Sequence, residues 1–316
     1  MAVARRDSAA GDSAAGNSAA GNWASRAGTS STAGPRNLAA RAFGSAPPPL
    51  LVLGGVVSVQ VGAAFAKQLF SVAGAFGLVT LRLVFAALVL AVIWRPSLRV
   101  DRRTLAVVAG YGVVMAGMNI SLYQAIARIP MGVAVTVEFL GPLAVAVFGS
   151  RRKLDLVWAG LAGLGVLLLS RADGGLDWVG VGFALLAASF WAGYILVSAK
   201  LGQRTSGGSG LALGMVVAAL VAVPFGAVES GPALVQPGVL AIGLVVALMS
   251  SVVPYSLELE ALRRIPPRVF GVLMSLEPAV AALAGLVVLG ETLGLLQWFA
   301  VACVVAASVG ATRSAR

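Results

Sequence analysis

Residues 128–149, RIPMGVAVTVEFLGPLAVAVFG, resemble residues 264–285, RIPPRVFGVLMSLEPAVAALAG, which lie 136 positions further along the chain. Both stretches begin with Arg-Ile-Pro, and in both another proline follows twelve residues after the proline of that motif. Single matches arise easily by chance in a sequence rich in Ala, Gly and Val, but the shared motif and proline spacing do not. The pattern therefore predicts an internal repeat, with one such stretch in each half.

Both stretches lie in a chain that has the composition of a membrane protein. Of its 316 residues, 59% are hydrophobic and 11% are charged, whereas soluble domains carry about 25% charged residues. A membrane-spanning helix needs about 20 mostly apolar residues. Such runs are predicted at 50–67, 73–94, 104–126, 131–149, 155–171, 178–199, 210–228, 238–260, 268–289 and 294–312.

The repeat and the spans together predict an all-α membrane protein of ten transmembrane helices. Residues 49–171 form the first half and residues 177–312 the second. Because each half holds an odd number of helices, the second must cross the membrane in the opposite sense to the first. Inverted repeats of this kind place the substrate site of a transporter near the midplane, between the halves.

The basic residues predict the orientation of the chain. With a cytoplasmic N-terminus, all Lys and Arg residues fall on the cytoplasmic side except Lys67, Arg128 and Arg171 outside and Arg82 within a helix. This asymmetry follows the positive-inside rule and predicts that both termini are cytoplasmic. Residues 1–48, in which SAAGD and SAAGN repeat, carry few large apolar residues and are predicted to be a disordered cytoplasmic tail.

Several classes of function find no support in the sequence. The chain has no histidine and one cysteine, Cys303, inside an apolar run. A serine–histidine triad and a histidine metal site are therefore excluded, and no Walker loop is present. The net charge of +11 is spread between the apolar runs, so a nucleic-acid surface is not indicated. We expect no enzymatic activity, no metal and no cofactor.

Three ionisable residues fall near the centres of predicted spans: Arg82, Glu138 and Glu277. A charge at this depth costs about 2.5–3.5 kcal/mol on insertion scales, so the three should face a cavity or one another. Arg82 is a candidate clamp for a substrate carboxylate, although an ion pair to either glutamate is an equal alternative. Glu138 and Glu277 are candidates for proton coupling, against the alternative of hydrogen bonds that pack helices.

Neutral polar residues add further candidates for substrate binding. Asn119 and Tyr123 share one face of their helix at a spacing of four residues, and Gln60 lies in the first span. Their alternative role is to bond neighbouring helices, worth about 1 kcal/mol each. Glu258 and Glu260 are expected to form surface ion pairs with Arg263 and Arg264.

Prolines within the spans are expected to bend their helices. Pro142, Pro254 and Pro278 are the three candidates, and each removes one backbone donor from its helix. Such bends are common in membrane helices, and at these positions they are also candidates for hinges of a gate.

The runs VEFLGP at Val137–Pro142 and MSLEP at Met274–Pro278 resemble the EamA family of the drug/metabolite transporter superfamily. Residues 253–293 and 121–143 are most similar to its threonine/homoserine exporter branch. The resemblance implies ten helices in two inverted EamA repeats, and export of small amino acids or their analogues. It also implies exchange for protons as the energy source.

The function predicted from these observations is secondary active export of an amino acid across the plasma (inner) membrane, by proton antiport with alternating access. The expected partners are a small-molecule substrate, protons and the lipid bilayer, and a homodimer is left open. An exporter of drugs or other metabolites is the alternative within the family, because a shared fold does not fix the substrate. A membrane-embedded enzyme or a channel is the alternative from another class.

Overall fold

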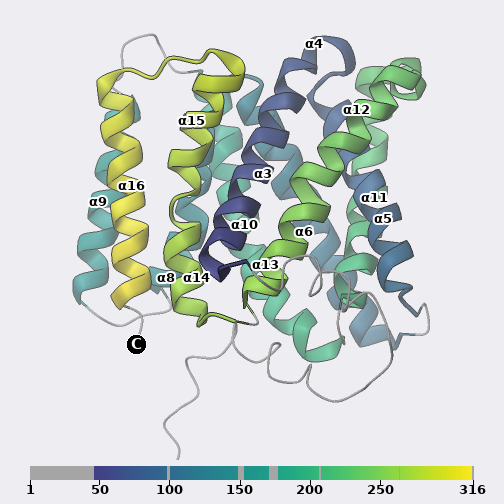
Figure 1. Ribbon diagram of the computed structural model, residues 1–316, viewed down its shortest axis with the longest axis horizontal. Helices are drawn as coiled ribbons and strands as arrows, with labels where there is room; N and C mark the ends of the chain where they lie inside the picture. The colour runs from purple at the N-terminus through teal and green to yellow at the C-terminus, as the bar shows by residue number, and fades with distance from the viewer. Residues whose placement is uncertain are drawn as a thin grey trace, which may run out of the picture.

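The computed structural model describes residues 46–97, 100–148, 153–170, 177–205, 208–262 and 264–314, and all regular elements among them are helical. Figure 1 shows a bundle whose long helices run between two ends: an upper end with α4 and a lower end with the C-terminus. Residues 1–45 of the predicted tail lie outside the described residues.

The long helices follow the predicted spans closely. Their bounds are α3 Pro48–Gln68, α5 Ala75–Trp94, α6 Arg102–Ile126, α7 Met131–Glu138, α8 Leu140–Phe148, α9 Lys153–Ser170, α10 Trp178–Arg204, α11 Ser209–Ser230, α12 Pro237–Ala247, α13 Val253–Leu262, α14 Pro267–Met274, α15 Glu277–Leu289 and α16 Leu295–Ser314. Short elements are α4 Phe70–Ala73, η1 Gly231–Val235 and the π-helical turn η2 Leu248–Val252. Two long helices begin at aspartates, Asp101 and Asp177, whose carboxylates accept N–H bonds of the first turn.

In the described part of the chain, nine helices are long and apolar enough to cross a membrane, each interrupted helix counting once. They match nine of the ten predicted spans. The remaining prediction, 155–171, corresponds to α9, for which the described residues give a shorter apolar helix, Leu156–Gly165. This helix packs beside α16 at one edge of the bundle (Figure 1).

Three helices are interrupted near the prolines that the sequence singles out. Phe139 separates α7 from α8 three residues before Pro142, and Ser275 and Leu276 separate α14 from α15 just before Pro278. The π-helical turn η2 ends two residues before Pro254. Proline lacks an N–H and crowds the carbonyl four residues earlier, so the helical register is disturbed before each proline. At each of the three prolines where the sequence predicts a bend, the regular α-helix is interrupted.

The core of the bundle is the contact between the two parts of the chain. The main packing pairs are α5 with α11, α6 with α10, α9 with α16, α3 with α13 and α15, and α7 with α15. Each pair joins a helix before residue 171 to one after residue 177. Glycine allows the closest approach, since a Cβ at Gly141 would lie 2.1 Å from the Ala188 carbonyl oxygen.

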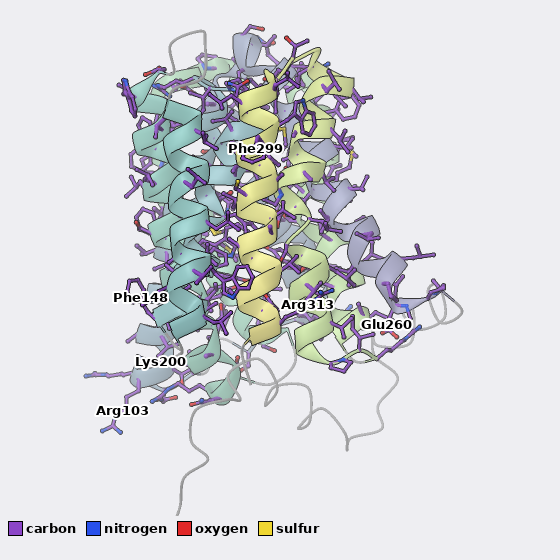
Figure 2. All side chains as sticks on the ribbon, turned by 90° about the vertical axis from the view of Figure 1, so that its left-hand side faces the viewer. Arg103, Phe148, Lys200, Glu260, Phe299 and Arg313 are labelled. Atoms are coloured by element: carbon purple, nitrogen blue, oxygen red, sulfur yellow. The ribbon has the colours of Figure 1, made fainter. Side chains whose placement is uncertain are left out.

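Basic side chains gather at the lower end. Figure 2 shows Arg103, Lys200 and Arg313 near this end, on helices that are far apart in the sequence. Large apolar side chains such as Phe148 and Phe299 point outward from the bundle, 88% and 59% exposed. An apolar perimeter with charge concentrated at an end is the surface that a bilayer requires.

Candidate functional site

Arg82 lies inside the bundle, on α5, and is 7% exposed. Its Nη2 donates to the Ser250 carbonyl oxygen at 2.9 Å, and its Nε donates to Ser251 Oγ at 3.3 Å. Its Cζ lies 5.6 Å from the centre of the Tyr123 ring. Within the described residues Arg82 forms no ion pair with Glu138 or Glu277. The guanidinium is held by neutral groups and retains unused N–H donors.

The π-helical turn η2 explains why Arg82 finds these acceptors. Pro254 has no N–H to donate to the carbonyls four or five residues before it, and the carbonyls of Met249 and Ser250 are therefore open to donors from other helices. Ser58 Oγ donates to the Met249 oxygen at 2.7 Å, and Arg82 takes the Ser250 oxygen. Interruptions of this kind are frequent at functional sites.

The two predicted glutamates lie close to Arg82. Glu277 is 8% exposed; its Oε1 accepts from Gln60 Nε2 at 2.9 Å, while its Oε2 is buried without a hydrogen-bond partner among the described residues. Glu138 is 4% exposed and interacts electrostatically with both Glu277 and Arg82. The structure thus brings Arg82, Glu138, Glu277 and Gln60 into one cluster, drawn from α5, α7, α15 and α3.

The two candidates on α6 behave differently from each other. Tyr123 is fully buried beneath Arg82 and against Phe70, and its hydroxyl has no partner among the described residues. Asn119 is 4% exposed, but its Nδ2 donates at 2.9 Å to the Met115 oxygen of its own helix. Tyr123 belongs to the cluster by contact, whereas the hydrogen bond of Asn119 stays within α6.

The expected surface ion pair of Glu258 is wrong. The expected pairing of Glu260 with Arg264, four residues later, is present, although Glu260 is buried and not on the surface. Arg263 lies outside the described residues. Glu258 is half-buried and interacts electrostatically with Glu277 and Tyr194. Sequence reasoning placed Glu258 by its distance from the helix end and missed which face of α13 carries it.

Other members of the cluster also escaped the sequence analysis. Ser250 and Ser251 contact Arg82, and Tyr255 interacts electrostatically with both Arg82 and Glu277. Tyr194 packs against Tyr111 with tilted rings, 5.2 Å between ring centres. The sequence signal that could have pointed to Ser250 was Pro254, because proline leaves the carbonyl oxygen four residues earlier without its helical N–H donor.

At the upper end, a separate set of polar contacts joins the two parts of the chain. Lys67 Nζ pairs with Glu291 Oε1 at 2.5 Å and donates to the Ile129 oxygen at 3.1 Å. Glu291 Oε2 accepts from the Met131 N–H at 2.8 Å. We call Lys67, Ile129, Met131 and Glu291 the upper lock. It ties the ends of α3 and α15 to the start of α7.

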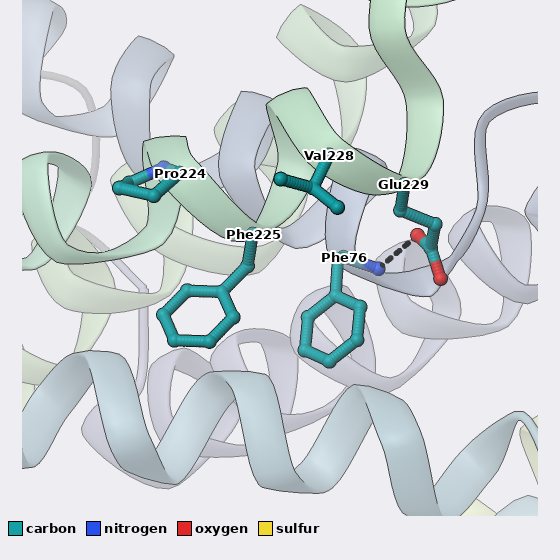
Figure 3. Close-up of a pocket in the computed structure, with 5 residues that line it drawn as sticks. All are labelled: Phe76, Pro224, Phe225, Val228 and Glu229. Carbon is teal, nitrogen blue, oxygen red and sulfur yellow. Dashed lines mark hydrogen bonds between the residues drawn. The ribbon is translucent and has the colours of Figure 1, made fainter.

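A surface groove at the upper end is distinct from the central cluster around Arg82 and from the upper lock. Phe76, Pro224, Phe225, Val228 and Glu229 line it, between α5 and α11 (Figure 3). Glu229 Oε2 accepts from the Phe76 N–H at 2.7 Å and from the Gly77 N–H at 3.1 Å, so its carboxylate caps the start of α5. The rest of the lining is apolar, and Phe225 and Val228 are 48% and 88% exposed. The groove offers little to hold a polar substrate.

Within the described residues, no three His, Cys, Asp or Glu side chains are placed to hold a metal ion. The central cluster offers one guanidinium, the carboxyl groups of Glu138, Glu258 and Glu277, and several hydroxyls.

Comparisons with known proteins agree with the resemblance read from the sequence. The EamA-like transporter family matches residues 178–313. The threonine/homoserine exporter RhtA of Escherichia coli K12 is 43% identical over 273 residues, which covers 85% of this chain and 92% of that protein. RhtA of Salmonella typhimurium LT2 matches with the same identity and coverage.

More distant likenesses point the same way. An uncharacterized transporter of Bacillus subtilis, YcbK, is 27% identical over 125 residues, or 38% of this chain and 40% of that protein. A solved crystal structure superposes with a TM-score of 0.57 at 21% identity, and the match covers 85% of this chain and 97% of that one. The structural likeness bears on the fold alone.

Proposed function

The chain belongs to the EamA-like transporter family, and on that premise we propose that it exports small amino acids or their analogues, such as threonine and homoserine, in exchange for protons. It is a multi-pass membrane transporter and not an enzyme. The substrate class rests on the relatives that carry that name and on the chemistry of the central cluster. The proposal includes ten helices in two inverted repeats, with both termini in the cytoplasm.

The observation that carries the proposal is the state of Arg82. A buried charge is costly unless it is paired, yet Arg82 is held by the Ser250 carbonyl and the Ser251 hydroxyl. Its remaining N–H donors suit the two oxygens of a carboxylate. A substrate carboxylate would complete the pair, and the amino group of the same substrate would meet Glu277 Oε2, which has no partner among the described residues.

Exchange for protons follows from competition for the carboxyl groups. A carboxylate that binds the substrate ammonium cannot bind a proton at the same oxygen. If the empty transporter returns only when Glu138 or Glu277 is protonated, each export cycle carries a proton inward. Gln60 holds one oxygen of Glu277 and leaves the other for this exchange.

Alternating access is supported by the upper lock. The lock joins α3 and α7 of the first half to the end of α15 in the second, so access from the upper end requires its contacts to break. In this proposal the N-terminus is cytoplasmic, the upper end faces outward, and the formed lock corresponds to a state closed on that side. Pro142, Pro254 and Pro278 interrupt their helices below the lock and are proposed as its hinges.

Weakening the upper lock is expected to favour opening at the upper end. Lys67→Met removes the charge and keeps much of the side chain's volume. A half-buried pair contributes on the order of 1 kcal/mol, so we expect up to about a fivefold faster reaction of a cysteine placed at Ala284, which is 6% exposed. The measurement uses a membrane-impermeant thiol reagent in a Cys303→Ser background.

The matched control for this measurement is Lys200→Met, at the lower end (Figure 2). It should leave the labelling rate at Ala284→Cys unchanged or lower it. Equal acceleration by the two lysine variants would contradict the assignment of the lock as a gate.

Growth on toxic amino-acid levels tests the substrate class. Cells that lack their own exporter and overproduce this chain should tolerate threonine and homoserine concentrations that stop control cells. Resistance to unrelated toxic compounds without resistance to these amino acids would instead favour the drug- or metabolite-exporter alternative. Overproduced Arg82→Ala protein should give no protection.

A further inference from the structure

Ser250 carries a buried hydroxyl that the fold does not use. The side chain is 2% exposed, and its Oγ has no hydrogen-bond partner among the described residues. Other hydroxyls in these helices bond to the carbonyl four residues earlier: Thr136 to Gly132, Ser256 to Val252 and Ser275 to Gly271. An unpartnered buried hydroxyl is costly, so the Ser250 hydroxyl calls for a functional explanation.

Ser250 lies between the two parts of the proposed amino-acid site, Arg82 for the substrate carboxylate and Glu277 for its amino group. Its carbonyl oxygen accepts from Arg82 at 2.9 Å. Its Oγ faces α3, where a Cβ added at Gly62 would lie only 2.4 Å away. Gly62 is two residues from Gln60, whose amide donates to Glu277. The hydroxyl thus belongs to the residue whose backbone oxygen holds Arg82, and it lies against the helix that carries Gln60, the partner of Glu277.

We propose that Ser250 Oγ recognises the side-chain hydroxyl of the substrate, and that Gly62, by lacking a side chain, leaves the room that Ser250 Oγ itself occupies beside α3. The assignment rests on the proposed function and goes beyond it by naming the residue that selects hydroxy amino acids. In such amino acids the hydroxyl is two or three bonds from the α-carbon, which suits a partner adjacent to Arg82. A hydroxyl both donates and accepts, so each of the two can satisfy the other.

Tyr123 is the competing candidate for this role. Its hydroxyl is also buried without a partner among the described residues. However, its ring lies against Arg82 and Phe70, and no backbone group of Tyr123 bonds to Arg82. Ser250 is joined to the clamp by a direct hydrogen bond, so its hydroxyl has the more fixed position relative to the substrate.

The test compares threonine and homoserine with 2-aminobutyrate, which has the same carbon skeleton as homoserine and threonine but no hydroxyl. In proteoliposomes, Ser250→Ala is expected to lower kcat/KM for threonine and homoserine about tenfold and to leave 2-aminobutyrate unchanged. Sites that bind a substrate hydroxyl discriminate strongly against analogues that lack it. Ser256→Ala is the matched control, because its hydroxyl bonds within its own helix, and it should preserve the wild-type preference.

A second readout does not depend on transport. Ser250→Ala removes an unpartnered group, so the empty protein should be as stable as wild type or more so. The thermal shift induced by threonine should fall toward the shift induced by 2-aminobutyrate. This measurement also establishes that the variant is folded.

Three results would overturn the assignment. Equal losses for all three amino acids in Ser250→Ala would show that Ser250 Oγ serves every substrate alike and does not select for a hydroxyl. Selective loss in Tyr123→Phe with wild-type selectivity in Ser250→Ala would move the role to Tyr123. Both results leave the proposed function standing. Failure of wild-type protein to transport any of the three would remove the proposed function, and this assignment with it.

Discussion

Replacing Arg82 with alanine is expected to reduce the apparent affinity for threonine by at least about a hundredfold. Truncating one member of a buried, hydrogen-bonded charge pair costs about 2–5 kcal/mol, and tenfold corresponds to about 1.4 kcal/mol. Arg82→Lys should also fail, since a lysine keeps the charge but cannot offer two parallel N–H groups to a carboxylate. The measurement is binding of threonine and of threonine amide to purified protein.

Binding of threonine amide distinguishes a role of Arg82 as a carboxylate clamp from a purely structural role of Arg82. Threonine amide lacks the carboxylate, so it should bind wild type weakly and lose little further in Arg82→Ala. Equal losses for threonine and its amide would remove the clamp assignment. Arg103→Ala is the control; Arg103 is exposed at the lower end (Figure 2) and its replacement should change neither affinity.

Glu277→Gln is expected to abolish the response of transport to a pH gradient, lowering gradient-driven export at least about tenfold. Glutamine still offers an oxygen to Gln60, so the contact between α3 and α15 survives. It cannot bind and release a proton. In wild type, acidifying the outer side relative to the cytoplasmic side should speed export, because protons move inward as substrate moves out.

Measurements in proteoliposomes with an imposed gradient test this prediction. Exchange of labelled for unlabelled substrate without a gradient should persist in Glu277→Gln more than gradient-driven export does. Glu138→Gln tests the second proposed coupling group in the same way. Glu229→Gln is the control, since Glu229 caps α5 away from the cluster. If both Glu277→Gln and Glu138→Gln respond to the gradient as wild type does, the coupling assignment fails.

The helices could be predicted because a bilayer imposes a simple rule on sequence. Apolar runs of about 20 residues must be spans, and the predicted run 73–94, for example, became α5, Ala75–Trp94. The effects of the prolines on their helices could be predicted for a different reason: the N–H that proline lacks is a property of that residue alone and needs no knowledge of the fold. Segment 155–171 corresponds to α9, for which the described residues give a shorter apolar helix, Leu156–Gly165.

The candidate site could be predicted only in part. The cost of burying charge identified Arg82, Glu138 and Glu277, and the structure places them together. That Arg82 would bond to Ser250 and Ser251 could not be predicted, because these partners are more than 160 positions away and depend on the π-helical turn. The Lys67–Glu291 pair was missed for the same reason: each residue looked like an ordinary charge at a helix end.

The central claim is that the cluster around Arg82 binds and translocates an amino acid by its carboxylate. The most direct test is counterflow in proteoliposomes: vesicles loaded with unlabelled threonine and diluted into a trace of labelled threonine. The account predicts transient accumulation of label with wild-type protein, competition by homoserine but not by threonine amide, and no accumulation with folded Arg82→Ala protein. Accumulation by Arg82→Ala at the wild-type rate would contradict it.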